Sequence, residues 1–168
     1  MDTALFSQYI DDHADAVRAY IWRRAGGLDA AISTPDDIAA DVWVTAWQKR
    51  DEAPEPSSPG AARAWMLRIA RFTLANHIRK TVTRRNIDAM RRDDDEVVAS
   101  AEAVVVSNEL LASCLAVVTP AEREVLMLSI WEGLGPQEIA EVLGITENAV
   151  SLRLHKARTK IATHLIAE

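Results

Sequence analysis

The sequence has few residues of several types, and each shortage excludes a class of protein. Among 168 residues there is one cysteine, so no internal disulfide can form, and cysteine and histidine nowhere show zinc-site spacing. No apolar run approaches the roughly 20 residues that span a bilayer. The first ten residues also lack the basic segment of a secretory signal. We therefore expect a cytoplasmic protein that needs no metal or other cofactor.

Sequence motifs of enzymes are also missing. There is no glycine-rich phosphate loop and no nucleophile motif. The four histidines are scattered along the chain, at His13, His77, His155 and His164. We expect that the chain is not an enzyme.

Positive charge is in deficit overall but is concentrated in two segments. The chain has 19 basic and 25 acidic residues. Residues 63–92 nevertheless hold 9 basic and 1 acidic side chains, and residues 150–168 hold 4 and 1. Since the local field decides where phosphates bind, the two basic segments are candidate nucleic-acid contacts within an acidic protein.

The pattern of apolar residues predicts an all-α fold of two small helical domains. Apolar side chains recur every three or four residues, and no strand-like alternation of any length occurs. A Thr-Pro pair followed by an acidic residue predicts helix starts at Thr34 and Thr119. We expect domains at 1–92 and 108–168, joined by a flexible acidic linker at 93–107.

Residues 135–158, GPQEIAEVLGITENAVSLRLHKAR, have the pattern of a helix-turn-helix. Pro136 suits a first helical position, Gly144 a left-handed helix end and Thr146 an N-cap. In the helix that follows, an apolar stripe from Val150 to Leu165 predicts the buried face. The rest of that helix is polar and basic, either a DNA-reading surface or a solvated face of a packing helix.

A second basic helix is predicted from about Ala62 to Arg84. On a helical wheel three arginines share one edge with Trp65, Phe72 and Asn76. Cations interleaved with aromatic rings are typical of surfaces that bind single-stranded or melting DNA. The alternative is that the two aromatic side chains belong to the core and the arginines are solvated.

Three stretches together resemble sigma-70-type factors of the extracytoplasmic-function (ECF) group. They are DDIAADVWVTAW, ARAWMLRIARFTLANHIRK and TPAEREVLMLSIWEGLGPQEIAEVLGITENAVSLRLHKAR, in the order and spacing of that family. The resemblance covers almost the whole chain. It implies a sigma-2 domain at 1–92, a sigma-4 domain at 108–168, and promoter-specific transcription initiation with core RNA polymerase.

The resemblance also implies site residues and partners. The helix at 36–47 would bind the clamp of the largest polymerase subunit through Asp37, Asp41, Trp43 and Trp47, although either tryptophan could instead be a core residue. The flap of the second subunit, promoter DNA and an anti-sigma factor are the other implied partners. The implied −10 contacts are Arg63, Trp65, Arg68, Arg71, Phe72, Asn76, Arg79 and Lys80. The implied −35 contacts are Asn148, Ser151, Arg153, His155, Lys156 and Arg158.

One other function fits part of the sequence. A regulator that binds duplex operators through its helix-turn-helix would explain residues 119–168 equally well. It would not explain the basic, aromatic helix at 63–80 or the acidic, aromatic helix at 36–47.

Overall fold

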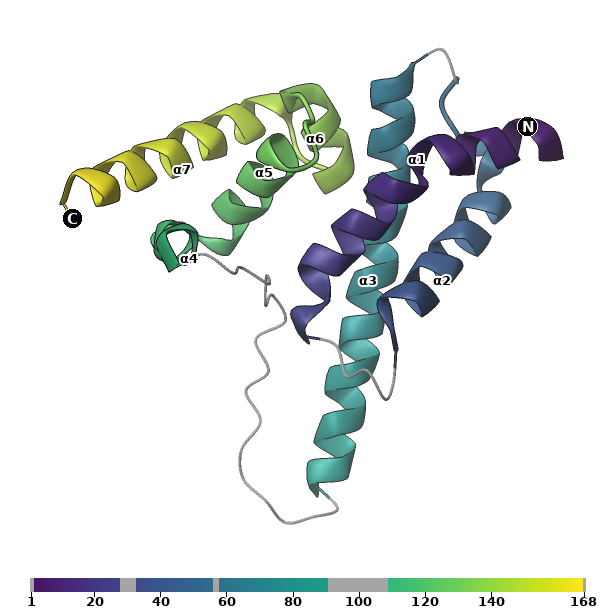
Figure 1. Ribbon diagram of the computed structural model, residues 1–168, viewed down its shortest axis with the longest axis horizontal. Helices are drawn as coiled ribbons and strands as arrows, with labels where there is room; N and C mark the ends of the chain where they lie inside the picture. The colour runs from purple at the N-terminus through teal and green to yellow at the C-terminus, as the bar shows by residue number, and fades with distance from the viewer. Residues whose placement is uncertain (1, 28–32, 56–57, 91–108, 168) are drawn as a thin grey trace. The chain divides into compact units, whose positions relative to one another are not determined.

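The structure, a computed structural model, describes residues 2–27, 33–55, 58–90 and 109–167. All regular secondary structure in these ranges is helical, which confirms the all-α fold (Figure 1). The chain divides into two compact units, one of residues 1–57 and 66–105 and one of residues 58–65 and 106–168. The domain boundaries at 92 and 108 stay a prediction, because the linker lies outside the described ranges.

The first unit is built from α1, α2 and most of α3. Helix α1 spans Thr3–Arg24 and continues into a 3-10 turn at Ala25–Gly27. Helix α2 spans Pro35–Gln48 and is followed by a 3-10 turn at Arg50–Glu52. Helix α3 spans Pro59–Met90, so it begins three residues before the predicted start, where a proline suits the first helical position.

The core of the first unit draws apolar side chains from all three helices. Helix α1 packs directly on α2. The side chains that are almost wholly inaccessible are Val17, Tyr20, Ile21, Ile38, Val42, Ala46, Met66, Leu67 and Ala70. Their recurrence at three- and four-residue spacing is the pattern that predicted the helices, and it leaves the other faces of α2 and α3 exposed.

The second unit contains four further helices, α4 to α7. They span Glu109–Ala116, Pro120–Ile130, Pro136–Leu143 and Glu147–Ala167. The predicted helix at 103–117 is therefore present from Glu109, and its earlier part lies outside the described ranges. Helix α7 packs against each of the other three helices of the unit.

The apolar stripe of α7 is buried along only part of its length. Val150, Leu154 and Ala157 are buried against α5 and α6, as predicted, together with Ile139 and Val142 of α6. Leu165 is 48% exposed, so the prediction that it joins the core is wrong. The reason is length, because α7 has 21 residues whereas α5 and α6 have 11 and 8.

Candidate nucleic-acid interface

The helix-turn-helix is formed by α6, a left-handed turn and α7. Gly144 ends α6 with φ +66°, a conformation that glycine adopts without the steric cost of a side chain. Thr146 then accepts a hydrogen bond from the Ala149 backbone N–H at 3.2 Å, which caps the start of α7. Because Val150 and Leu154 point into the core, the opposite side of α7 faces solvent.

The six residues predicted to contact the −35 element all lie on α7, and together we call them the α7 surface. They are Asn148, Ser151, Arg153, His155, Lys156 and Arg158, and all are exposed except the half-buried Arg153. Leu152, which is 52% exposed, is a neighbour that sequence reasoning missed. Its spacing of four from Asn148 and three from His155 places it on the same face, where an apolar group can contact a thymine methyl.

One basic residue of α7 is held inside its own domain. Lys160 Nζ lies 2.7 Å from Glu122 Oε2 at the start of α5. The same carboxylate accepts the Thr119 backbone N–H at 2.9 Å and completes a capping box. The Lys160 hydrogen bond, together with that from Thr119, lowers the pKa of Glu122 from 4.5 to about 2. Lys160 therefore fastens α7 to α5.

A second polar face runs along α3. Arg68, Phe72, Asn76, Arg79 and Lys80 are exposed, at spacings of three and four that place them along one side of the helix. With the half-buried Arg71 they form what we call the α3 surface. Arg79 Nη1 donates to Asn76 Oδ1 at 3.1 Å, and the Arg71 guanidinium lies 5.9 Å from the Phe72 ring centre.

The two aromatic residues of this helix differ in exposure. Phe72 is 55% exposed, which agrees with an aromatic ring available to a ligand. Trp65 is buried, as the alternative of a core residue predicted, and Arg63 is half-buried. Both Trp65 and Arg63 belong to the second unit, so they are described apart from the α3 surface.

An exposed stripe of mixed acidic and apolar character runs along α2, and we call it the α2 surface. It consists of Asp37, Ala40, Asp41, Val44 and Trp47, at spacings of three and four. Val44 is 56% exposed at the middle of the stripe and was missed, although its spacing from Asp37 and Asp41 would have found it. Trp43, predicted to be part of this interface, is half-buried at its margin.

Three of the predicted polymerase contacts also have structural partners within the fold, and the first two are Asp37 and Trp47. Asp37 Oδ2 accepts hydrogen bonds from the Thr34 backbone N–H at 2.8 Å and its hydroxyl at 2.7 Å. These bonds lower the pKa of Asp37 below its ordinary value. The Trp47 ring meets Phe6 edge-on at 5.0 Å, and the Arg50 guanidinium lies 4.4 Å from its centre. Trp47 is thus oriented by neighbours before it meets any partner.

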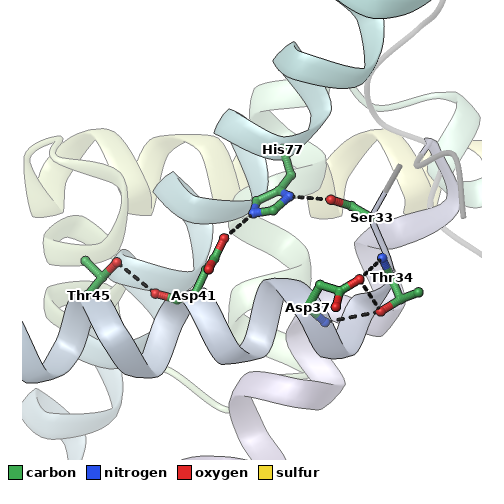
Figure 2. A network of polar contacts seen from close by, with 6 residues as sticks. All are labelled: Ser33, Thr34, Asp37, Asp41, Thr45 and His77. Carbon is green, nitrogen blue, oxygen red and sulfur yellow. Dashed lines mark hydrogen bonds and ion pairs between the residues drawn. The ribbon is translucent and has the colours of Figure 1, made fainter. Parts of the chain in front are cut away.

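Asp41 takes part in a line of polar contacts that reaches α3. Figure 2 shows the His77 ring between Ser33, which precedes α2, and Asp41. Ser33 Oγ lies 2.6 Å from His77 Nδ1, and His77 Nε2 lies 2.8 Å from Asp41 Oδ2. Ser33 and His77 are buried, whereas the Asp41 side chain is 58% exposed.

Comparison with known protein families accounts for both units. The family model described as "Sigma-70 region 2" matches residues 9–85, and "Sigma-70, region 4" matches residues 108–161. The chain belongs to the sigma-70 family. Relatives named as ECF RNA polymerase sigma factors, SigL and BldN among them, place this sigma factor in the ECF group, as the sequence predicted.

Similarity to individual sigma factors extends over most of the chain. The ECF RNA polymerase sigma factor SigL of Mycobacterium tuberculosis is 28% identical over 163 residues, covering 93% of this chain and 86% of SigL. The RNA polymerase sigma factor CnrH of Cupriavidus metallidurans is 30% identical over 144 residues, covering 79% of this chain and 74% of CnrH. This sigma factor therefore directs transcription initiation.

Two solved structures resemble the fold. CnrH in complex with the cytosolic domain of CnrY matches with a TM-score of 0.61 and 26% identity, over 99% of this chain and 91% of that one. The sigma factor RpoE of Bartonella quintana, in complex with the anti-sigma factor NepR, matches with a TM-score of 0.66 and 19% identity, over 97% and 98%. The second likeness concerns the fold alone.

The described ranges contain neither a membrane-spanning helix nor a cluster of metal ligands. No helix there is long and apolar enough to cross a membrane. Within the same residues no group of three or more histidine, cysteine, aspartate and glutamate side chains could hold a metal ion.

Proposed function

We propose that this sigma factor recognises the −35 promoter element through the α7 surface and the −10 element through the α3 surface. The single observation that carries the proposal is the α7 surface itself. Short polar side chains near the start of a capped helix are followed by exposed Lys156 and Arg158. The short side chains suit base edges, and the cations suit phosphates.

The α3 surface supports a different kind of DNA contact. Exposed Arg68, Arg79 and Lys80 follow a strand's phosphates, while Phe72 offers a ring on which an unpaired base stacks. Half-buried Arg63, at the start of the same helix, completes the proposed −10 contacts, whereas the buried Trp65 is a core residue. Such a surface binds melted rather than closed DNA, and the −10 element is melted during initiation.

The α2 surface is the proposed contact with the clamp of the largest polymerase subunit. Its carboxylates attract cations, and Val44 and Trp47 give apolar area in the middle and at the end of the stripe. Half-buried Trp43 contributes at the margin. The second domain binds the flap of the second subunit, so that polymerase holds both domains on one promoter and makes the second DNA contact effectively intramolecular.

The proposal also covers how the protein is regulated and where it acts. An anti-sigma factor restrains the protein, a proposal supported by the complex of the 26% identical sigma factor CnrH with the cytosolic domain of CnrY. The protein acts in the cytoplasm and catalyses no reaction itself, since polymerase carries out the chemistry and this chain supplies promoter choice.

The test compares the free protein with the holoenzyme on a promoter duplex and on a pre-melted promoter at matched salt. We expect weak duplex binding by the free protein, strong binding by the holoenzyme, and a further gain on the pre-melted DNA. Tight sequence-specific duplex binding by the free chain, with no gain from core polymerase, would instead identify an operator-binding regulator.

The polymerase contact is tested separately with a charge reversal. Asp41→Arg places a cation against the proposed cationic partner and should abolish holoenzyme assembly. Asp12→Arg, on the exposed side of α1, is the matched control and should assemble normally. Equal assembly by both folded variants would remove the α2 surface from the polymerase interface.

A further inference from the structure

His77 joins two elements that have different proposed partners. It projects from α3, between Asn76 and Arg79 of the α3 surface, yet its own side chain is only 11% exposed. Its two ring nitrogens contact Ser33 at 2.6 Å and Asp41 at 2.8 Å (Figure 2). The buried imidazole is therefore bonded on both sides, and one of its partners belongs to the α2 surface.

The chemistry of the partners fixes the roles of the two nitrogens. An ionised carboxylate only accepts hydrogen bonds, so Nε2 must be protonated and its N–H must donate a hydrogen bond to Asp41 Oδ2. In the neutral ring Nδ1 then accepts a hydrogen bond from the Ser33 hydroxyl, and in the charged ring the Nδ1–H donates one to the Ser33 oxygen. Both protonation states satisfy the contacts, so Asp41 keeps its bond to His77 in either.

Asp41 itself has a bonded side and an open side. One carboxylate oxygen accepts from His77, while 58% of the side chain remains exposed to solvent. Further along α2, the Thr45 hydroxyl donates to the Asp41 backbone carbonyl at 2.8 Å. The carboxylate is thus oriented by one buried donor and faces outward with the rest of its surface.

We infer that His77 is a positioning residue for polymerase binding, which holds the Asp41 carboxylate in the orientation that meets a polymerase cation. This inference rests on the proposed polymerase contact of the α2 surface. A carboxylate fixed before binding has less rotamer freedom to lose when the complex forms. His77 acts only through Asp41, because its own side chain is buried.

The order serine, histidine, aspartate is also that of a hydrolytic triad, but the exposures exclude that use here. In such a triad the serine oxygen must reach a substrate. Ser33 is 7% exposed and its hydroxyl faces the imidazole, whereas the aspartate is the exposed member. The accessible group of this network is a carboxylate, which suits the binding of a cation.

The experiment is a double-mutant cycle on the full-length chain, with affinity for core polymerase as the readout. The single variants are His77→Leu and Asp41→Ala, and the third is the double variant. Thr81→Val is the matched control, because Thr81 is a buried polar residue one turn further along α3. His77→Gln is the conservative variant, since its amide nitrogen can donate to Asp41 from near the position of Nε2.

We expect His77→Leu to weaken core binding roughly two- to tenfold, the range for freeing one side chain. His77→Gln should recover part of that loss and Thr81→Val should bind normally. In the Asp41→Ala background, His77→Leu should cause no further loss. If His77→Leu does not fold, Ser33→Ala replaces it, with a smaller loss that again disappears in the Asp41→Ala background.

Two results would contradict the inference in distinguishable ways. If Asp41→Ala weakens binding but the loss from His77→Leu is absent, or is undiminished in the Asp41→Ala background, the positioning role is wrong and the α2 surface stands. If Asp41→Ala itself binds core polymerase normally, the proposed polymerase contact of Asp41 is wrong, and the positioning role falls with it.

Discussion

Two helices of this sigma factor begin with the same local arrangement and use it differently. Both α2 and α5 start with a threonine cap, a proline and an acidic residue that bonds back to the threonine. At α2 the acid, Asp37, is exposed on a proposed partner surface. At α5 the acid, Glu122, is buried and also binds Lys160 of α7. An identical cap thus leaves a free surface in one domain and fastens two helices together in the other.

The difference follows from what packs beside each cap. Glu122 forms an ion pair with Lys160 of α7, a helix that packs along α5, so its charge is used in a contact within the domain. The Asp37 carboxylate accepts hydrogen bonds from the backbone N–H and the hydroxyl of Thr34, and Asp37 is otherwise exposed on the side where a partner would bind. We therefore expect the stability of the fold to depend more on Glu122, and the proposed polymerase binding to depend more on Asp37.

The largest effect should come from removing each acid in turn. Glu122→Ala removes the carboxylate of the α5 capping box and leaves Lys160 without its partner, whereas Asp37→Ala removes the carboxylate of the α2 capping box at the surface. Hydrogen exchange on the full-length protein should show strong loss of protection in α5 and α7 for the first variant. Loss confined to the first turn of α2 is expected for the second. Similar, local losses in both variants would contradict the proposed difference.

Acid should reveal the same difference. Because folding holds the pKa of Glu122 at about 2, below its ordinary 4.5, the folded state favours the ionised form. Its contribution to stability is complete above pH 4.5 and is lost as the pH falls toward 2. Glu122→Gln keeps the shape but cannot titrate, so unfolding of the second domain followed by hydrogen exchange should depend less on pH in this window. An unchanged pH profile would show that the contact with Lys160 does not stabilise the ionised form of Glu122.

The threonine caps should behave alike, in contrast to the acids. Thr34→Ala and Thr119→Ala each remove one hydroxyl that accepts a backbone N–H at a helix start. Each loss should cost about 1 kcal/mol of stability. Denaturant unfolding monitored separately in α2 and α5 by exchange measures both. A much larger loss of stability at one position would mean that the two threonine hydroxyls do not contribute equally to their helix starts.

These caps also show what the sequence could and could not predict. Thr34, Thr119, Gly144 and Thr146 act within a few residues along the chain, so their types and spacings predicted the helix ends that the structure confirms. The exposed α7 surface followed in the same way, since an apolar stripe determines the opposite face of a helix.

Contacts between distant residues could not be predicted in this way. Lys160 is 38 residues from Glu122, and His77 is 36 from Asp41. Sequence patterns predicted the helices that carry these residues but not which residues lie beside one another, because that depends on how the helices pack. For the same reason Trp65 and Phe72, two aromatic residues on one predicted edge, differ in burial.

The smallest expected effect concerns two lysines of α7 and their contribution to DNA binding. Lys156 is exposed on the α7 surface, whereas Lys160 one turn later is bound to Glu122. Lys156→Gln should remove one phosphate contact and reduce the salt slope of promoter binding by about 0.9. Lys160→Gln keeps a donor for Glu122 and should leave the slope almost unchanged. Holoenzyme binding to a promoter across a salt series measures both slopes. An equal reduction in the two variants would place Lys160 on the DNA, and would mean that the buried cap at α5 shares its cation with a phosphate.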